Sequence, residues 1–159
     1  MTKSTVSYSS FLSEQLNEIA THIPNRDSFN LKVSKVPVAW HLDHSLKTIN
    51  SIFRAMESSD PELFRSNFSV SRFFVYAYGD FPRGYAKAPR LVLPPDNITT
   101  KSLYRQLEEA KVNSSKLEYL HTKSHFKHPY FNVIDKDQSK RFLKIHTRHH
   151  LKIVRDILK

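Results

Sequence analysis

Cysteine is missing from this sequence of 159 residues. Disulfide bonds, thiolate metal ligands and a cysteine nucleophile are therefore excluded together. Any metal ion that the chain binds must rest on nitrogen and oxygen ligands.

Glycine is nearly missing as well, because the chain has only two, Gly79 and Gly84. Tight hairpin turns commonly depend on glycine for backbone angles that other residues avoid. The scarcity therefore favours helices joined by loops over a fold built from hairpins.

Long apolar segments are absent too. No stretch of the chain approaches the roughly 18 consecutive apolar residues of a membrane-spanning helix. Residues 1–10 are polar and rich in hydroxyl groups, unlike a secretory signal. These features predict a cytoplasmic protein with no membrane partner. The length suits one domain covering residues 1–159, with a flexible N-terminus at residues 1–8.

Apolar residues recur at three- and four-residue steps in five segments. This pattern predicts helices at residues 9–23, 37–57, 60–78, 100–122 and 135–158. The sequence between them predicts an extended connection at 27–35, a long proline-rich loop at 80–97 and an irregular stretch at 125–134. With no strand long enough to found a sheet, the predicted fold class is all-α.

Two histidines of the last predicted helix stand four residues apart, His146 and His150. At about 100° per residue, both fall on the apolar side of the helix, near Phe142, Ile153 and Ile157. A pair at this spacing stacks two imidazoles one turn apart, which suits chelation of a single ion. Two ligands bind weakly, so a third should come from another segment.

The predicted helix at 37–57 offers two candidates for the third ligand, His41 and His44. Helical-wheel geometry alone slightly favours His41, which falls closer to the apolar centre. The alternative for all of these residues is a set of core histidines satisfied by hydroxyl and backbone groups. His149 is either a hydrogen-bond partner of a ligand or a plain packing residue.

Several segments resemble the DinB-like superfamily of metal-dependent helical bundles. They are 40–46 (WHLDHSL) and 146–152 (HTRHHLK), and the segments FPRG at 81–84, AKAP at 86–89 and HPYF at 128–131 resemble a poorly characterised branch of it. The resemblance implies a four-helix bundle of the up-down-down-up type with a long proline-rich crossing loop. Asn132 departs from the pattern, in which glycine often follows the phenylalanine.

The resemblance also selects the metal ligands, which are His44, His146 and His150, with His41 and His149 in reserve. The expected cofactor is a divalent ion such as zinc, nickel or iron, all of which imidazole and water suit. Three imidazoles leave room for water or substrate, as a catalytic site requires. Asp43, Asp80 and Glu118 stay open as a fourth ligand.

These observations support a metal-dependent enzyme of unknown substrate, of the hydrolase type or of the thiol-dependent transferase or isomerase type that the resemblance implies. Its partner would be a small molecule or a low-molecular-weight thiol. The alternative is a non-enzymatic metal-binding or interaction protein. The sequence contains no Gly-rich phosphate loop, Gly-x-Ser-x-Gly elbow or His-Glu-x-x-His motif. Whether the chain forms a homodimer stays open.

Positive charge is in excess, because 25 Lys and Arg face 15 Asp and Glu, for a net charge of +10. This raises a third hypothesis, a basic nucleic-acid binder. Seven basic residues fall on the side of the last predicted helix opposite the histidines, which we interpret as a solvated face: Lys140, Arg141, Lys144, Arg148, Lys152, Arg155 and Lys159. Support for nucleic-acid binding is weak. Such binding is helped by exposed aromatic side chains on which bases can stack, whereas Phe142, the aromatic residue of this helix, is expected to point inward.

An aromatic cluster lies around the start of the proline-rich loop, and we interpret it as core. Its members are Phe73, Phe74, Tyr76, Tyr78, Phe81 and Tyr85. The alternative is an anion-binding mouth over the metal, formed with Arg83, Lys87 and Arg90.

Overall fold

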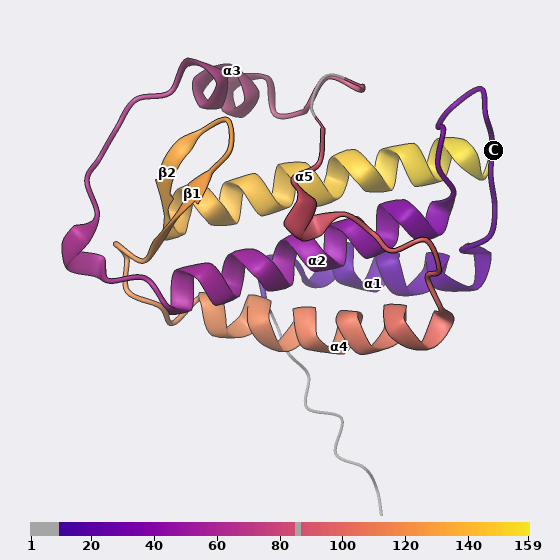
Figure 1. Cartoon of the computed structure of the whole chain (residues 1–159), viewed down its shortest axis with the longest axis horizontal. Helices are drawn as coiled ribbons and strands as arrows, with labels where there is room; N and C mark the ends of the chain where they lie inside the picture. Colours follow the sequence, from indigo (N-terminus) through magenta and orange to yellow (C-terminus); the bar gives the residue numbers. More distant parts are fainter. Residues whose placement is uncertain (1–9, 85–86) are drawn as a thin grey trace, which may run out of the picture.

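Four helices pack around one core in the computed structural model, which describes residues 10–84 and 87–159. They are α1 (Ser13–His22), α2 (Val38–Glu57), α4 (Thr100–Leu117) and α5 (Lys136–Ile157). Both α2 and α1 contact α4 and α5. Helices α1 and α5 run in one direction and α2 and α4 in the other (Figure 1). The N-terminus that the sequence predicts to be flexible, at residues 1–8, lies outside the described residues.

The core forms where the apolar sides of these helices meet, which explains why the three- and four-residue spacing predicts them. Helix α2 lies closest to its centre, and fourteen of its twenty residues are buried. Fully buried side chains from all four helices meet there: Leu16, Ile19, Leu46, Ile49, Leu103, Leu107, Leu143 and Val154.

Polar groups join α2 to α4 inside the fold. Gln106 donates to Asp43 Oδ1 at 2.7 Å, and Asn113 donates to Asn50 Oδ1 at 3.0 Å. Asn50 in turn donates to the carbonyl of Gln106 at 3.1 Å. Buried polar groups are costly without partners, so this network holds α2 and α4 in one register.

The observed helix boundaries agree with the predicted ones where the sequence contains a strong capping signal. Helix α4 begins with a capping box of Thr99 and Ser102, and α5 with one of Asp135 and Gln138. Two ends differ, because α1 begins at Ser13 rather than at residue 9 and α4 ends at Leu117 rather than at 122. No glycine or proline, the residues that usually mark a helix boundary, stands at either of these two ends.

The predicted helix at 60–78 is wrong over its first half. Only a 3-10 turn, Pro61–Leu63, forms at its start, and the helix α3 covers Val70–Tyr78. The Ser69 hydroxyl accepts from the backbone N–H of Arg72 at 3.3 Å and so caps a new helix there. Phe64 and Phe68 precede this cap and lie outside regular structure.

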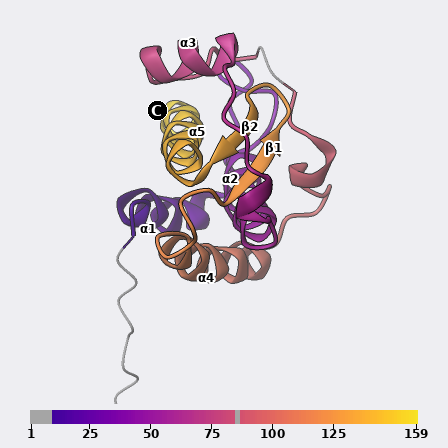
Figure 2. The ribbon, with the colours of Figure 1, turned by 90° about the vertical axis from the view of Figure 1, so that its left-hand side faces the viewer.

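Helix α3 turns a polar side inward. Among the described members of the aromatic cluster, the interpretation as core is confirmed for Tyr76 and Phe81, which pack against the core, and is wrong for the rest. The one buried residue of α3 is Arg72, which donates to the carbonyls of Phe131 (3.2 Å) and Val133 (3.4 Å). Phe73, Phe74 and Tyr78 are instead 57%, 64% and 83% exposed. Figure 2 shows α3 on the outside of α5. Tyr85 lies outside the described residues.

A two-stranded antiparallel hairpin replaces the irregular stretch that the sequence predicts at 125–134. Its strands are β1 (His125–His128) and β2 (Asn132–Asp135). Asn132 has a φ of 60° and supplies the left-handed turn conformation that glycine usually provides. The argument from scarce glycine is therefore wrong at this turn, and all-α describes the main body rather than the whole chain.

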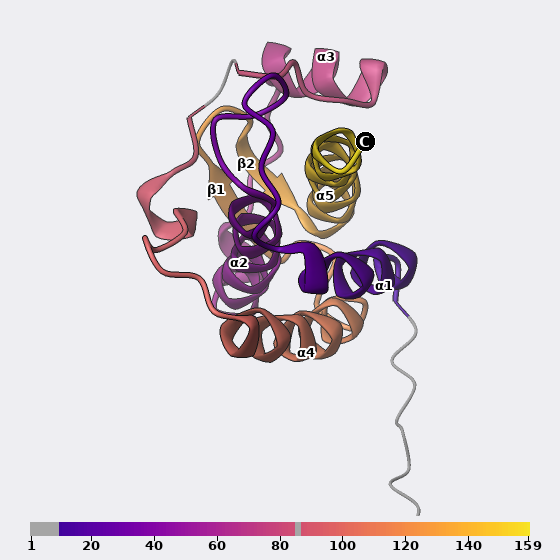
Figure 3. The same ribbon diagram turned by 90° about the vertical axis from the view of Figure 1, so that its right-hand side faces the viewer.

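The proline-rich loop at 80–97 has one short 3-10 turn, Arg90–Val92, within its described residues. It runs across the outer side of α2 (Figure 3) and places the Val92 carbonyl against that helix. The connection at 27–35 forms no strand. None of the helices in the described part of the chain combines the length and the apolar character that crossing a bilayer would need.

Candidate metal centre

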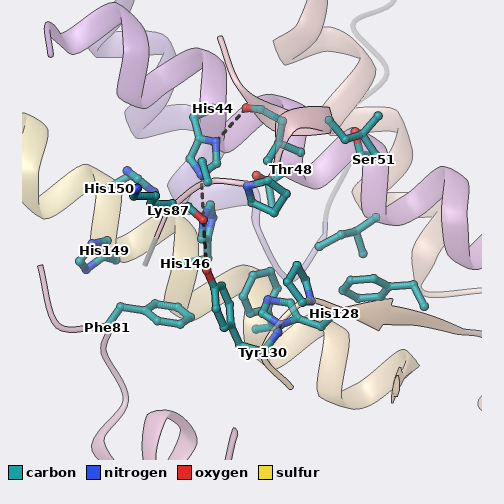
Figure 4. Close-up of a pocket in the computed structure, with 18 of the residues that line it drawn as sticks. His44, Thr48, Ser51, Phe81, Lys87, His128, Tyr130, His146, His149 and His150 are labelled. Carbon is teal, nitrogen blue, oxygen red and sulfur yellow. Dashed lines mark hydrogen bonds between the residues drawn. The ribbon is translucent and has the colours of Figure 1, made fainter. Parts of the chain in front are cut away.

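Three histidines from two helices converge at one point, and they are His44, His146 and His150 (Figure 4). One ring nitrogen of each lies within 4.8 Å of the others. His44 comes from the first half of α2, whereas His146 and His150 stand one turn apart on α5. The two segments that the sequence suggested for a metal site therefore do meet in space. We call these three residues the histidine triad.

The spacing within the triad fits a small divalent ion. Nε2 of His44 lies 3.2 Å from Nε2 of His146. An ion at the usual zinc–nitrogen distance of about 2.0–2.1 Å from both atoms would see them at roughly 100°, close to the tetrahedral angle. Because the third nitrogen can lie up to 4.8 Å away, a ring rotation that moves it by about one ångström would complete the set.

A backbone carbonyl orients His44. Its Nδ1 lies 2.9 Å from the carbonyl oxygen of Val92, on the proline-rich loop. A carbonyl can only accept, so Nδ1 carries the proton and Nε2 keeps a lone pair directed at the triad. This partner on the far nitrogen is the usual arrangement for a metal-binding histidine.

His41 stands behind His150 and does not belong to the triad. Its Nδ1 lies 3.0 Å from Nδ1 of His150, and its Nε2 lies 3.0 Å from the Ser34 hydroxyl. If His41 donates to Ser34 and accepts from His150, Nε2 of His150 is left with its lone pair. The structure brings His44 rather than His41 to the α5 pair, so the wheel's slight preference for His41 is not borne out.

His149 also lies outside the triad and contacts the proline-rich loop. Its Nδ1 is 3.2 Å from Asp80 Oδ1, and Lys152 binds the second oxygen of the same carboxylate. Burial would raise the pKa of Asp80, but hydrogen bonds from Lys152, the Phe81 N–H and His149 lower it overall. Asp80 therefore fastens the start of the loop to α5.

The ring of His146 is held by packing. Its Nδ1 is buried and makes no hydrogen bond to the described residues. Phe142 and Phe81 lie against the ring at centroid distances of 5.3 and 6.2 Å. Because Nε2 of His44 keeps its lone pair, Nε2 of His146 donates to it at 3.2 Å.

Burial keeps the triad neutral. It lowers the pKa of His44, and it lowers the pKa values of His146 and His150 well below the usual 6.5, with the neighbouring histidines adding to the effect. Neutral imidazoles have free lone pairs, and only this form binds a metal ion. The three rings are therefore uncharged at neutral pH, which metal binding requires.

A cavity of about 390 Å³ opens beside the triad, and all three histidines line it. Its wall is formed by α2, α5, the hairpin and the proline-rich loop. An ion held here would keep positions open toward the cavity for water or substrate. The aromatic part of the wall includes Phe81, so this one member of the predicted cluster does border the site.

The carboxylates that the sequence could not exclude as a fourth ligand are engaged elsewhere. Asp43 pairs with Lys47 at 2.7 Å, and Glu118 pairs with Lys140 at 2.6 Å. Asp80 binds His149 and Lys152 as described. Within the described residues, the donor set at the cavity is thus three imidazole nitrogens.

The basic residues of α5 mostly have partners within the chain. Arg155 pairs with Glu18 at 2.7 Å, and Arg141 and Arg148 donate to the carbonyls of Tyr76 and Gly79. Lys140 and Lys152 bind Glu118 and Asp80. These contacts attach α1, α3 and two loops to α5.

Sequence reasoning missed two contributors to the site. The Val92 carbonyl carries no signal in the sequence because it is a backbone group. His128 lines the cavity from the hairpin, and only its place in the HPYF segment could have drawn attention to it. No family model matches this chain, and comparisons with curated proteins and with solved structures find no significant match.

Proposed function

We propose that this protein is a metal-dependent enzyme of the DinB-like type, with the up-down-down-up bundle of that superfamily. One divalent ion, zinc, nickel or iron, would rest on His44, His146 and His150. The observation that carries the proposal is the convergence of three neutral ring nitrogens within 4.8 Å at the wall of a cavity.

The chemistry would be hydrolysis, transfer or isomerisation of a small molecule. When bound, a divalent ion lowers the pKa of a coordinated water or thiol and so supplies a nucleophile. The chain's own residues have simpler roles: Val92 orients His44, and Phe81 and Phe142 pack around His146 and limit the access of water.

The second candidate is a non-enzymatic metal-binding protein. It is favoured by the origin of the ligands, because an ion on the triad would connect α2 with α5. Metal would then raise stability without any reaction. Incubating metal-loaded protein with a panel of thiols and electrophiles separates the two. Turnover that His146→Ala abolishes supports the enzyme, and no turnover with any pair supports the structural role.

Metal analysis of tag-free protein tests the proposal shared by both candidates. We expect about one equivalent of zinc or nickel in the wild type and in the control His121→Ala, which changes an exposed histidine. His44→Ala, His146→Ala and His150→Ala should each lose tight binding, whereas His149→Ala should retain it. Equal metal content in all variants would refute the histidine triad as the site.

A further inference from the structure

Several polar side chains line the cavity besides the histidine triad, and the imidazole of His128 is one of them. This residue ends β1, and it is 8% exposed. Figure 4 draws it among the lining side chains, on the hairpin side of the cavity. The ring of Phe142 lies against both His128 and His146, at centroid distances of 4.6 and 5.3 Å.

The hairpin turn fixes the proton of His128. Its Nδ1 accepts hydrogen bonds from the backbone N–H groups of Tyr130 and Phe131, both at 3.1 Å. A nitrogen that accepts cannot carry the proton, so the neutral ring carries it on Nε2. Burial lowers the pKa of His128 to about 4, which keeps the ring neutral at pH 7.

The Nε2–H group has no hydrogen-bond partner among the described residues, although the ring is held firmly. Phe131 stacks on it at 4.3 Å and Phe142 meets it edge-on. A rigid donor at a cavity wall with no protein partner favours a ligand that brings an acceptor, because the two can pair without reordering the ring.

The other residues of the cavity wall indicate the polarity and the charge of that ligand. It is mainly apolar and aromatic, with Trp40, Ile52 and Phe126 among its residues. Lys87 and Lys127 are exposed at the same cavity, and none of its described lining residues is Asp or Glu. A cationic ligand would therefore meet no carboxylate among these residues, whereas an anionic oxygen would meet a donor and two positive charges.

We infer that the cavity binds a small, largely apolar carboxylate, whose oxygen accepts a hydrogen bond from Nε2–H of His128. The volume of about 390 Å³ lies in the lower part of the range for small-molecule pockets, roughly 300–1,000 Å³. The inference deepens the proposed function by naming a substrate class for the same cavity. Binding of the carboxylate itself does not require the ion.

The single tryptophan of the chain makes the test direct, because Trp40 lines the cavity and its fluorescence reports occupancy. Metal-free protein, kept with a chelator, would be titrated with 4-phenylbutyrate, its amide and 4-phenylbutylamine. These probes share one apolar body and differ in charge. The acid should bind most tightly, the amide at least tenfold more weakly, and the amine not measurably.

His128→Asn isolates the donor. Asparagine can still accept from the two backbone N–H groups of the turn, but it lacks a group that reaches as far as Nε2. This variant should bind the acid at least tenfold more weakly, whereas the control His125→Asn, on the same strand but outside the lining, should bind as the wild type does. Circular dichroism checks that both fold.

A second variant covers the case in which His128→Asn does not fold. Ala55→Phe adds a ring where α2 lines the cavity, and it should abolish binding of the acid. Equal affinity for the amine and the acid, or unchanged affinity in His128→Asn, would overturn the inference. Zinc binding is measured in a separate titration of the same protein. If zinc binds and the acid does not, only the inference of a carboxylate ligand is refuted. If the acid binds and zinc does not, only the proposal of a metal site at the histidine triad is refuted.

Discussion

Single side chains set the chemistry of this site through the proton that each ring carries. The carbonyl of Val92 fixes the proton of His44, and the turn at Tyr130 and Phe131 fixes that of His128. For His150 the corresponding partner is His41, at 3.0 Å. In these three rings, the neighbouring group therefore determines which nitrogen carries the proton and which nitrogen can bind a metal ion or a ligand.

His41 should affect metal affinity without being a ligand. Replacing it by phenylalanine removes the acceptor for Nδ1–H of His150, and we expect zinc affinity to fall about 10- to 100-fold while the stoichiometry stays at one. His41→Gln, which keeps an acceptor oxygen, should recover part of the loss. Competition with a chromophoric chelator measures both, and a Phe variant with wild-type affinity would contradict the role.

The pKa of His128 predicts a dependence of stability on pH. The folded protein holds this pKa at about 4, below the usual 6.5, so the unfolded chain takes up a proton first as the pH falls. The residue's contribution to the free energy of unfolding is largest above pH 6.5 and decreases below it, by roughly 1 kcal/mol at pH 5.5. His128→Asn should lose correspondingly less stability than the wild type between pH 7.5 and 5.5.

Urea unfolding of the metal-free proteins at the two pH values measures this difference. The comparison uses the change with pH and not the absolute stability, because the variant also alters the turn. A change as large in His128→Asn as in the wild type would show that another residue takes up the proton.

The sequence predicts individual ligands only where a helix has two distinct sides. Helix α5 has such sides, so its spacing alone points to His146 and His150. Helix α2 is buried around most of its circumference, and both His41 and His44 are buried, so a helical wheel cannot separate them. In the sequence, the choice of His44 rests on the resemblance to the DinB-like superfamily. In the structure, His44 lies on the side of α2 that faces α5 and the proline-rich loop, so it is the histidine that meets His146 and His150.

At the level of elements, the hairpin depends on one unusual backbone conformation. Asn132 has a φ of 60°, which asparagine tolerates better than residues other than glycine. We expect Asn132→Gly to leave the stability almost unchanged and Asn132→Val to lower the free energy of unfolding by roughly 1–2 kcal/mol. Thermal unfolding compares the three proteins, and a stable valine variant would contradict the strained turn.

The start of α3 and the hairpin escaped prediction because neither is fixed by local sequence alone. Helix α3 is short and is held by the hydrogen bonds of Arg72 to Phe131 and Val133, about sixty residues away. The hairpin in turn packs on α5 through Phe131, which lies against Phe142. Apolar spacing continues back through Phe68 and Phe64, so it predicts a helix that begins too early, and it gives no sign that Arg72 is the buried residue.

At the scale of the whole molecule, the four helices of the bundle could be predicted because apolar residues recur in each at three- and four-residue steps. Their mutual arrangement could not be derived from periodicity, since it depends on buried pairs such as Gln106 with Asp43 and Asn113 with Asn50. That arrangement is also what brings α2 and α5 together at the triad.

An ion on the triad would connect helices that are far apart in the sequence, so metal should stabilise the entire fold. At a free zinc concentration 100-fold above the dissociation constant, the gain is about 2.7 kcal/mol. For a domain of this size we expect the melting temperature to rise by roughly 5–10 °C. The rise should disappear in His146→Ala and on chelation, and a similar rise in His146→Ala would place the ion elsewhere.

Anomalous X-ray diffraction from crystals of the zinc-loaded, tag-free protein tests the central claim most directly. We predict one strong peak about 2.0–2.1 Å from a ring nitrogen of His44, His146 and His150, with the remaining coordination open toward the cavity. A zinc-loaded crystal without a peak at this point, or with its peak on other side chains, would contradict the account.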